Sequence, residues 1–278
     1  LRSYSDPILY IKMPDSGEEH WVIPNNQDAM FGAIGDALRG QPAICITCDE
    51  ASKKTIPLDS PLARYDSRDM DIEATLDAQG NLRGTAVQVY DGPSANYGRA
   101  LLRQQTEETK RSKFIEALLS EHIPGAIVTR YEIKQADNPD APLTFIIEFE
   151  REQYARVDGT NLVLRAAIFR QPLGSVYGTL PKRTLPLMLG RSRHFDDTLR
   201  IKLPAGMTPT LRSQAGSWDL NAAFGEYQRS VTIDGNVLEI SQRIDVPIQR
   251  VQPKAYARFQ KWAISVEQSS GLLLELAK

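Results

Sequence analysis

Apolar and polar residues alternate strictly in the stretch that follows residue 69. Apolar side chains occupy every second position over residues 70–76, and the period of two resumes over residues 82–90 after a polar turn at residues 77–81. Successive side chains of a strand point to opposite faces, so this period gathers the apolar side chains on one face. The pattern predicts a β-hairpin with one buried face.

The same alternation returns along most of the remaining chain. Further strands are predicted over residues 127–133, 143–149, 162–169, 199–203, 231–233 and 237–240, the last two joined by the turn Asp234-Gly235. Many short strands joined by turns favour a sandwich, because a parallel α/β sheet needs a helix between most strands. The expected fold class is mainly β (α+β): an antiparallel β-sandwich-like domain with two or three accessory helices.

Helical spacing interrupts this pattern in a few places. One stripe of apolar residues predicts a helix of about 15 residues that ends near His122, and another predicts a helix that opens at Pro253. The two stripes are Phe114, Ile115, Leu118 and Leu119, and Tyr256, Phe259, Ala263 and Val266. Residues 171–198 are rich in Pro and Gly, and we expect them to be irregular, either as a ligand surface or as a covering flap.

The first 60 residues have the pattern of a separate small unit. Strands are predicted over residues 8–11, 20–23 and 42–47, with a short helix over residues 29–38. A connector punctuated by proline follows, which places a domain boundary near residues 57–66. We therefore expect a first unit over residues 1–62 and a β-rich domain over residues 63–278, with a division of the latter near residue 185 as an alternative. Since the chain starts with Leu1, we expect it to begin inside a longer gene product.

Composition narrows the classes of function. The chain has 278 residues, of which 33 are basic and 35 are acidic, for a net charge of −2. The charges are spread along the sequence, with no basic block beyond Lys53-Lys54, whereas nucleic acid requires a clustered positive face. No run of 18 apolar residues occurs that would span a membrane as a helix. We therefore expect neither nucleic-acid binding nor a transmembrane segment.

Two cysteines are spaced like a redox or metal motif. Cys45 and Cys48 match C-x-x-C, but the residues around Cys45 favour a strand, on which positions i and i+3 face opposite sides. Acidic residues follow instead of the cations that activate a thiol. No further His or Cys pair stands at metal spacing. We expect ordinary thiols, and we assign no metal ligand and no cofactor.

The three histidines offer little replacement chemistry. His20 stands next to Trp21 in the first hairpin, where we expect it to face solvent or to pack at an edge. His122 follows the predicted helix, where a cationic ring would be favourable against the helix dipole. His194 has Asp196 and Asp197 beside it, which is compatible with a proton-transfer pair or a weak metal site but is more typical of a solvated turn.

Two further groups of residues have some features of binding sites. Asp66, Asp69 and Asp71 are spaced loosely like a calcium loop, but the Gly and Glu that complete such a loop are missing. A set of aromatic residues is compatible with a carbohydrate or peptide groove, although core packing is the more common role. These residues are Tyr90, Tyr97, Tyr177, Trp218 and Tyr227.

Both ends of the chain resemble a known family. The runs PILYIKMPDSGEEHWVIPNNQ and GDALRGQPAICI resemble the tail of the transglutaminase-like domain in large bacterial multidomain proteins. The run GNVLEISQRIDVPIQRVQPKAYARFQKWAISVEQSSGLLLEL is similar to the β-rich domain of unknown function that follows it. The resemblance implies that residues 1–62 are the tail of a papain-type Cys-His-Asp domain and that the remainder is the closing domain. The nucleophilic Cys of that class would lie upstream of Leu1.

The same resemblance indicates that the catalytic residues of the family are missing. Its general base falls on Pro7 and its orienting Asp falls on Ile23, while Asn25 and Asn26 could orient a base only in a shifted register. Pro and Ile can neither carry a proton nor hold an imidazole, and the loss of one triad member costs about three to six orders of magnitude in rate. We therefore assign no catalytic residue and favour a degenerate, non-enzymatic unit.

Three functions follow as hypotheses. The preferred one is a non-catalytic interaction or scaffold module of a bacterial transglutaminase-like protein, with a protein or peptide partner. The resemblance places such a module outside the cytoplasm, in the periplasm or at the cell surface. The first alternative is a structural or substrate-contacting part of an active transglutaminase or cysteine peptidase, and the second is a carbohydrate-binding sandwich. The sequence leaves the ligand and the oligomeric state open.

Overall fold

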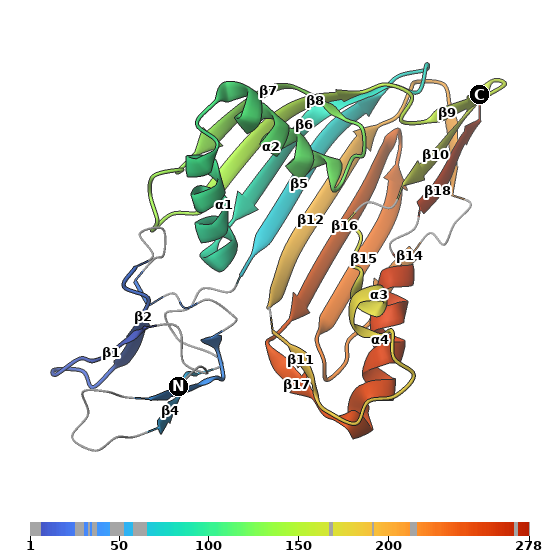
Figure 1. Ribbon diagram of the computed structural model, residues 1–278. Coiled ribbons are helices and arrows are strands. Elements are labelled where there is room, and N and C mark those ends of the chain that lie inside the picture. Colours follow the sequence, from blue (N-terminus) through green and yellow to red (C-terminus); the bar gives the residue numbers. More distant parts are fainter. Residues whose placement is uncertain are drawn as a thin grey trace.

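A computed structural model describes most of the chain, and one large mixed sheet dominates it (Figure 1). The described residues are 7–25, 31–32, 34, 38–44, 53–57, 66–166, 169–190, 192–211, 216–269 and 272–277. Eight strands form this sheet in the order β14-β15-β16-β12-β5-β6-β8-β7. They are β5 (Arg68–Leu76), β6 (Leu82–Tyr90), β7 (Ile127–Lys134), β8 (Leu143–Arg151), β12 (Arg193–Lys202), β14 (Gly216–Asp219), β15 (Glu226–Asp234) and β16 (Val237–Val246).

The alternating segments form the strands that their period predicts. The hairpin of β5 and β6 pairs Leu76 with Leu82 and Arg68 with Tyr90, and the inward positions of β5 are all buried from Met70 onward. The hairpin of β15 and β16 closes at the Asp234-Gly235 turn. The expected mainly β, α+β class is therefore confirmed.

One neighbouring pair in this sheet is parallel. β12 lies beside β5 with Leu199 opposite Ile72, and both strands run in the same direction. The two strands are far apart in the sequence, and the intervening residues supply β6, β7, β8 and two helices. Alternation predicts that a segment is a strand but not which distant strand it joins, so the antiparallel expectation did not include this pair.

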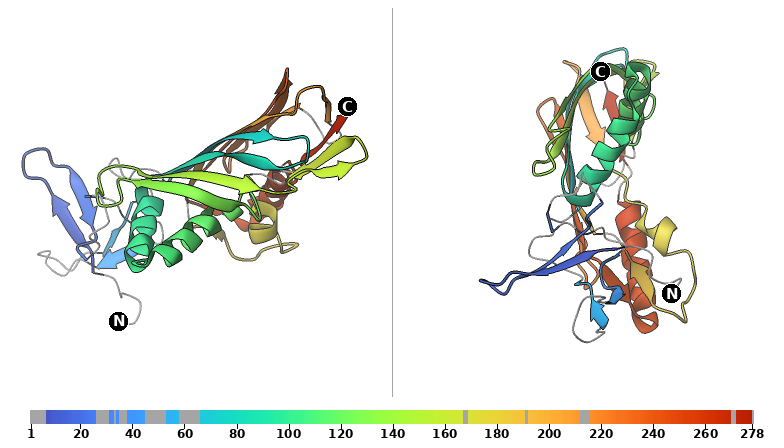
Figure 2. Two further views of the ribbon diagram at one scale, coloured as in Figure 1. Left: turned by 90° about the horizontal axis from the view of Figure 1, so that it is seen from above. Right: turned by 60° about the vertical axis from the view of Figure 1, so that its left-hand side comes forward.

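Four helices lie on one side of the large sheet (Figure 2). They are α1 (Gly92–Gln104), α2 (Glu108–Ser120), α3 (Leu173–Tyr177) and α4 (Tyr256–Gln268), the last preceded by the 3-10 turn η2 (Pro253–Ala255). The predicted stripe of α4 is buried, and Trp262 joins it. No helix in the described part of the chain combines the length and apolarity that a membrane span needs.

Smaller sheets complete the fold. A four-stranded sheet has the order β13-β18-β10-β9, and three separate pairs are β11-β17, β1-β2 and β3-β4. Their bounds are β1 (Leu9–Lys12), β2 (Glu19–Val22), β3 (Pro42–Ile44), β4 (Lys53–Thr55), β9 (Arg156–Asp158), β10 (Asn161–Ala166), β11 (Leu187–Leu189), β13 (Thr208–Leu211), β17 (Gln249–Val251) and β18 (Leu272–Ala277). The expectation that residues 171–198 are irregular is wrong in part, because α3, β11 and the start of β12 lie there.

Apolar side chains gather in three clusters. The largest packs the inward faces of the central strands, including Ile72, Phe145 and Leu199, against α1, α2 and the four-stranded sheet. A second cluster lies at α4 and includes Phe259 and Ile244. A small third cluster of Trp21, Ile34 and Ile56 belongs to the N-terminal segments. The proposed boundary near residues 57–66 falls mostly outside the described residues, so the division into residues 1–62 and 63–278, like that near 185, stays a prediction.

Candidate functional site

A row of polar side chains crosses the helix-covered face of the large sheet. Arg229 of β15, Gln242 of β16 and Asp197 of β12 stand opposite one another in the strand register. These three residues are only 2%, 1% and 0% exposed, respectively. Apolar residues of the largest cluster lie on one side of this polar row, and residues of the α4 cluster lie on the other. Polar side chains are rarely buried this deeply without a structural or functional reason.

Hydrogen bonds join the polar row to the end of α4. Gln242 Nε2 donates to Asp197 Oδ2 at 3.4 Å, and Gln242 Oε1 accepts from Arg229 Nη1 at 3.3 Å and from Tyr227 OH at 3.1 Å. Ser269 Oγ, just after α4, donates to the Tyr227 hydroxyl oxygen at 2.6 Å. These hydrogen bonds therefore connect the end of α4, through β15 and β16, with β12.

Burial dominates the electrostatics of Asp197. It raises the pKa of this carboxyl to about 7, with Asp69 and Asp196 adding to the rise and Arg68 opposing it. Asp197 Oδ1 accepts no hydrogen bond from the described residues. A carboxyl with such a pKa exchanges its proton near neutral pH, so the polar row is the part of the fold that is best placed to respond to pH.

His122 lies on the same side of the sheet and is neutral. The residue is 5% exposed, and its ring stands 5.7 Å from the ring of Phe169. Burial, together with the nearby Arg68 guanidinium, lowers its pKa to about 3. The expectation of a cationic ring at a helix end is therefore wrong. A helix dipole is worth at most about 2 kcal/mol, whereas this shift corresponds to about 5 kcal/mol.

The structure divides the predicted His194 cluster between two faces. His194 and Asp196 lie on β12 itself, not in a turn, and Asp197 faces the opposite side of the sheet. His194 Nδ1 stands 3.4 Å from Asp245 Oδ2 on the neighbouring β16. Among the described residues, no three His, Cys, Asp or Glu side chains come together as a metal site. Asp69 and Asp71, whose spacing loosely resembles that of a calcium loop, lie instead on the regular strand β5.

The N-terminal hairpin forms as predicted, with β1 paired to β2. Pro7 is exposed, and Ile23 packs against the small cluster that contains Trp21. His20 is 8% exposed rather than solvent-facing. Its Nε2 stands 3.7 Å from Glu18 Oε2, beyond hydrogen-bonding distance. Asn25 is exposed, and Asn26, Cys45 and Cys48 lie outside the described residues.

The aromatic residues considered for a groove are scattered. Tyr227 is fully buried, while Tyr97 is 68% exposed on α1. Tyr90 packs edge-on against Phe145 at 5.8 Å in the largest cluster, whereas Tyr177 packs at the edge of the α4 cluster. These residues do not form one stacking platform in the described part of the chain.

The sequence contained a signal for the polar row. Asp197 has the same parity as the inward residues Leu199 and Ile201, and Gln242 has the parity of Ile240 and Ile244. A polar residue at an inward position of a clean alternation is a local conflict, which is expected at functional or specificity-determining positions. Neither residue was predicted to lie in a buried polar row.

Comparison with known proteins gives limited matches. Residues 160–274 match the model of a domain of unknown function, DUF3858. A crystal structure described as that of a presumed protease from Parabacteroides distasonis is similar to part of the chain, at 17% identity and a TM-score of 0.32. That match covers 41% of this chain and 23% of the other. No curated protein matches the chain.

Proposed function

We propose that this chain is a non-catalytic interaction or scaffold module of a bacterial transglutaminase-like protein, located outside the cytoplasm. The match of residues 160–274 to a domain of unknown function agrees with the β-rich closing domain that the sequence resembles. The transglutaminase context and the compartment rest on that resemblance alone. The partner in this proposal is a protein or peptide.

The hairpin carries the proposal. At the position where the family has an Asp, Ile23 packs against the apolar cluster of Trp21, Ile34 and Ile56. At the position of the general base, Pro7 is exposed and has no proton to transfer. A cysteine nucleophile needs a base within hydrogen-bond reach and a third group that orients that base. The side chains at these two positions supply neither.

His20 is the side chain that could replace the missing base. It is buried beside the ring of Phe31, at 5.4 Å between ring centroids, and its Nδ1 has no hydrogen-bond partner among the described residues. The acidic side chain of Glu18 stands 3.7 Å away and is highly exposed, so it holds the ring only weakly. This geometry suits an imidazole that packs a small core better than one that shuttles protons.

A transamidation assay on the full-length protein tests the proposal. The protein is incubated with a fluorescent primary amine and a glutamine peptide, and the expected result is no incorporation above that of the heated protein. The variant His20→Ala serves as the matched control and should leave this background unchanged. Incorporation that disappears in His20→Ala, or on mutation of a cysteine upstream of Leu1, would overturn the proposal in favour of an active enzyme.

A further inference from the structure

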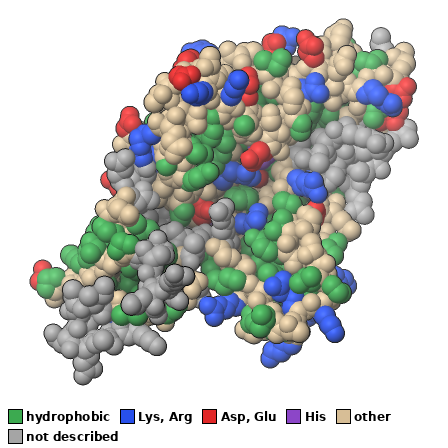
Figure 3. Space-filling model, in the orientation of Figure 1, with side chains coloured by type: hydrophobic (Ala, Val, Ile, Leu, Met, Phe, Trp, Pro, Cys, Tyr) green, Lys and Arg blue, Asp and Glu red, His purple; other side chains and the backbone are tan. Residues whose placement is uncertain are grey.

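Positive charge is concentrated around α3 and α4. The segments 169–190 and 247–269 together contain seven Lys and Arg residues and one Glu, a net charge of +6, in a chain whose net charge is −2. The two segments are far apart in sequence, but α3 and α4 pack side by side, and β11 pairs with β17. Lys and Arg side chains gather at this end of the molecule in Figure 3.

Three of these cations form a stripe along η2 and α4. Lys254, Arg258 and Lys261 are spaced i, i+4 and i+7, which places them on one side of a helix. All three are exposed, opposite the buried stripe that faces the core. None of them has an ion-pair partner within the described residues. Their charges are therefore available to a partner.

Exposed aliphatic residues border this basic stripe. Val176, Leu180, Leu185 and Ile264 are exposed by 53%, 46%, 73% and 38%. The main chain around Gly174 touches Ile264, because a Cβ at Gly174 would stand 3.0 Å from Ile264 Cα. A contiguous apolar patch rimmed by polar residues is a feature of interaction sites.

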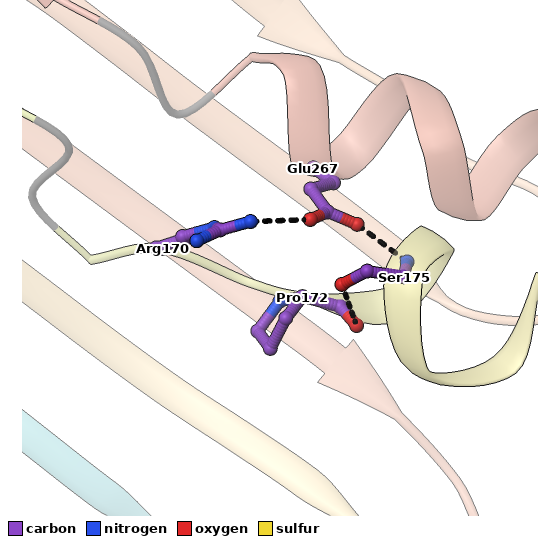
Figure 4. Close-up of polar contacts among 4 residues, drawn as sticks. All are labelled: Arg170, Pro172, Ser175 and Glu267. Carbon is purple, nitrogen blue, oxygen red and sulfur yellow. Dashed lines mark hydrogen bonds and ion pairs between the residues drawn. The ribbon is translucent and has the colours of Figure 1, made fainter.

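The surface is held rigidly. Glu267 of α4 accepts hydrogen bonds from Ser175 N at 2.7 Å and from Arg170 Nη2 at 2.8 Å, which ties α3 to α4 (Figure 4). Gln260 Nε2 donates to Leu180 O at 3.0 Å, and Tyr256 OH donates to Tyr177 O at 3.1 Å. A surface that is already ordered loses little entropy when a partner binds.

The positions of the cations also oppose helix stability. The N-terminal end of a helix carries partial positive charge, so acidic residues in its first turn are stabilising. The first turns of η2 and α4 contain no acidic residue, and Lys254 and Arg258 stand there instead. An anionic group that lies against this end of the helix would offset the cost.

We propose that the face formed by Lys254, Arg258 and Lys261 together with Val176, Leu180, Leu185 and Ile264 docks an acidic polypeptide segment that carries apolar side chains. We call it the α3/α4 face. The inference rests on the proposed function and specifies its partner. The aromatic residues of the described parts of both segments are buried or half-buried. A lipid interface favours exposed Trp and Tyr, and single-stranded nucleic acid favours exposed stacking rings, so a polypeptide fits this face better than either.

The test measures the binding of a fluorescent amphipathic peptide of Glu and Leu, about 18 residues or five helical turns long, to the whole chain by anisotropy. The triple variant Lys254→Glu, Arg258→Glu, Lys261→Glu should bind at least about 10-fold more weakly. A matched control, Lys113→Glu, Lys134→Glu, Lys202→Glu, changes the net charge equally at exposed positions elsewhere and should bind like the unmodified chain. Circular dichroism and thermal unfolding establish that both variants fold.

A second variant probes the apolar part. Leu185→Ser with Val176→Ser removes exposed aliphatic area without touching a charge, and it should weaken peptide binding several-fold. Equal binding by both triple variants would overturn the inference. So would equal binding of a Lys–Leu peptide, or preferential binding of phosphatidylglycerol vesicles or a single-stranded oligonucleotide.

The two proposals fail separately. Transamidation by the full-length protein together with normal peptide binding would overturn the non-catalytic assignment alone. Absent peptide binding together with absent transamidation would overturn the α3/α4 face alone.

Discussion

The pH dependence of stability is the most direct test of the buried polar row. We consider the variant Asp197→Asn, which removes the titrating group but keeps an oxygen that can accept the 3.4 Å hydrogen bond from Gln242. Burial raises the pKa of Asp197 from 3.8 to about 7 in the folded chain. Between these values the folded state binds more protons than the unfolded state, so the free energy of unfolding decreases as pH rises.

The size of the effect follows from the shift. One pKa unit corresponds to about 1.4 kcal/mol, so the ionisation of Asp197 costs the folded chain about 4 kcal/mol once the pH exceeds 7. The Asn variant does not bear this cost. The difference in unfolding free energy between the variant and the unmodified chain should therefore increase by about 4 kcal/mol from pH 4 to pH 8. Nearly all of this increase should occur below about pH 7.

Urea unfolding followed by tryptophan fluorescence at several pH values measures this gain. Titrating groups that do not interact with Asp197 contribute equally in both proteins, so their contributions cancel in the difference. Asp196→Asn is the control, since this neighbouring side chain is exposed on the opposite face; its effect should stay within about 0.5 kcal/mol. A difference between Asp197→Asn and the unmodified chain that does not change from pH 4 to pH 8 would refute the reasoning.

Three further predictions follow from the packing and titration of other residues. The pKa of His122 falls to about 3 in the folded chain, so this residue destabilises the fold as the pH decreases below its ordinary pKa of 6.5. The variant His122→Leu should therefore reduce the loss of stability between pH 7 and pH 4 by about 3 kcal/mol in urea titrations. An unchanged acid sensitivity would contradict the burial of this ring. Leu199→Ala at the fully buried centre of β12 should cost about 2–5 kcal/mol of unfolding free energy, and a loss below 1 kcal/mol would count against the assigned core. Gly174→Val would press a side chain against Ile264 and Glu267 and should lower stability by about 1–3 kcal/mol. Ser175→Ala, at an exposed position, should change stability little. Equal effects of the two variants would argue against close packing of α3 on α4.

Local pattern predicted the strands well because the period of two is a property of each segment. The β5–β6 hairpin, the Asp234-Gly235 hairpin and α2 all lie within a few residues of their predicted positions. Helix α1 was missed, because its buried residues are Ala95, Arg99 and Leu102 rather than a stripe of large apolar side chains. Its signal was the start: Asp91 caps the helix by accepting from Gly92 N, and Pro93 follows in the first turn.

The candidate site was harder to predict, because it depends on pairing between distant segments. The sequence placed His194, Asp196 and Asp197 together, but a strand sends alternate side chains to opposite faces. The polar row brings Asp197 beside Gln242, 45 residues later in the chain. The α3/α4 face could not be predicted for the same reason, since its cations lie near α4 and most of its exposed aliphatic residues lie about 80 residues earlier in the chain.

The parallel pairing of β5 with β12 has a consequence for any attempt to excise the matched domain. Residues 160–274 include β12 and β16 but leave out β5, so a fragment cut at residue 160 would present the backbone amides and carbonyls of β12 to solvent, beside a row of large aliphatic side chains. Such an unprotected margin recruits other chains. The smallest soluble fragment should therefore begin ahead of Arg68 and retain the hairpin that shields β12.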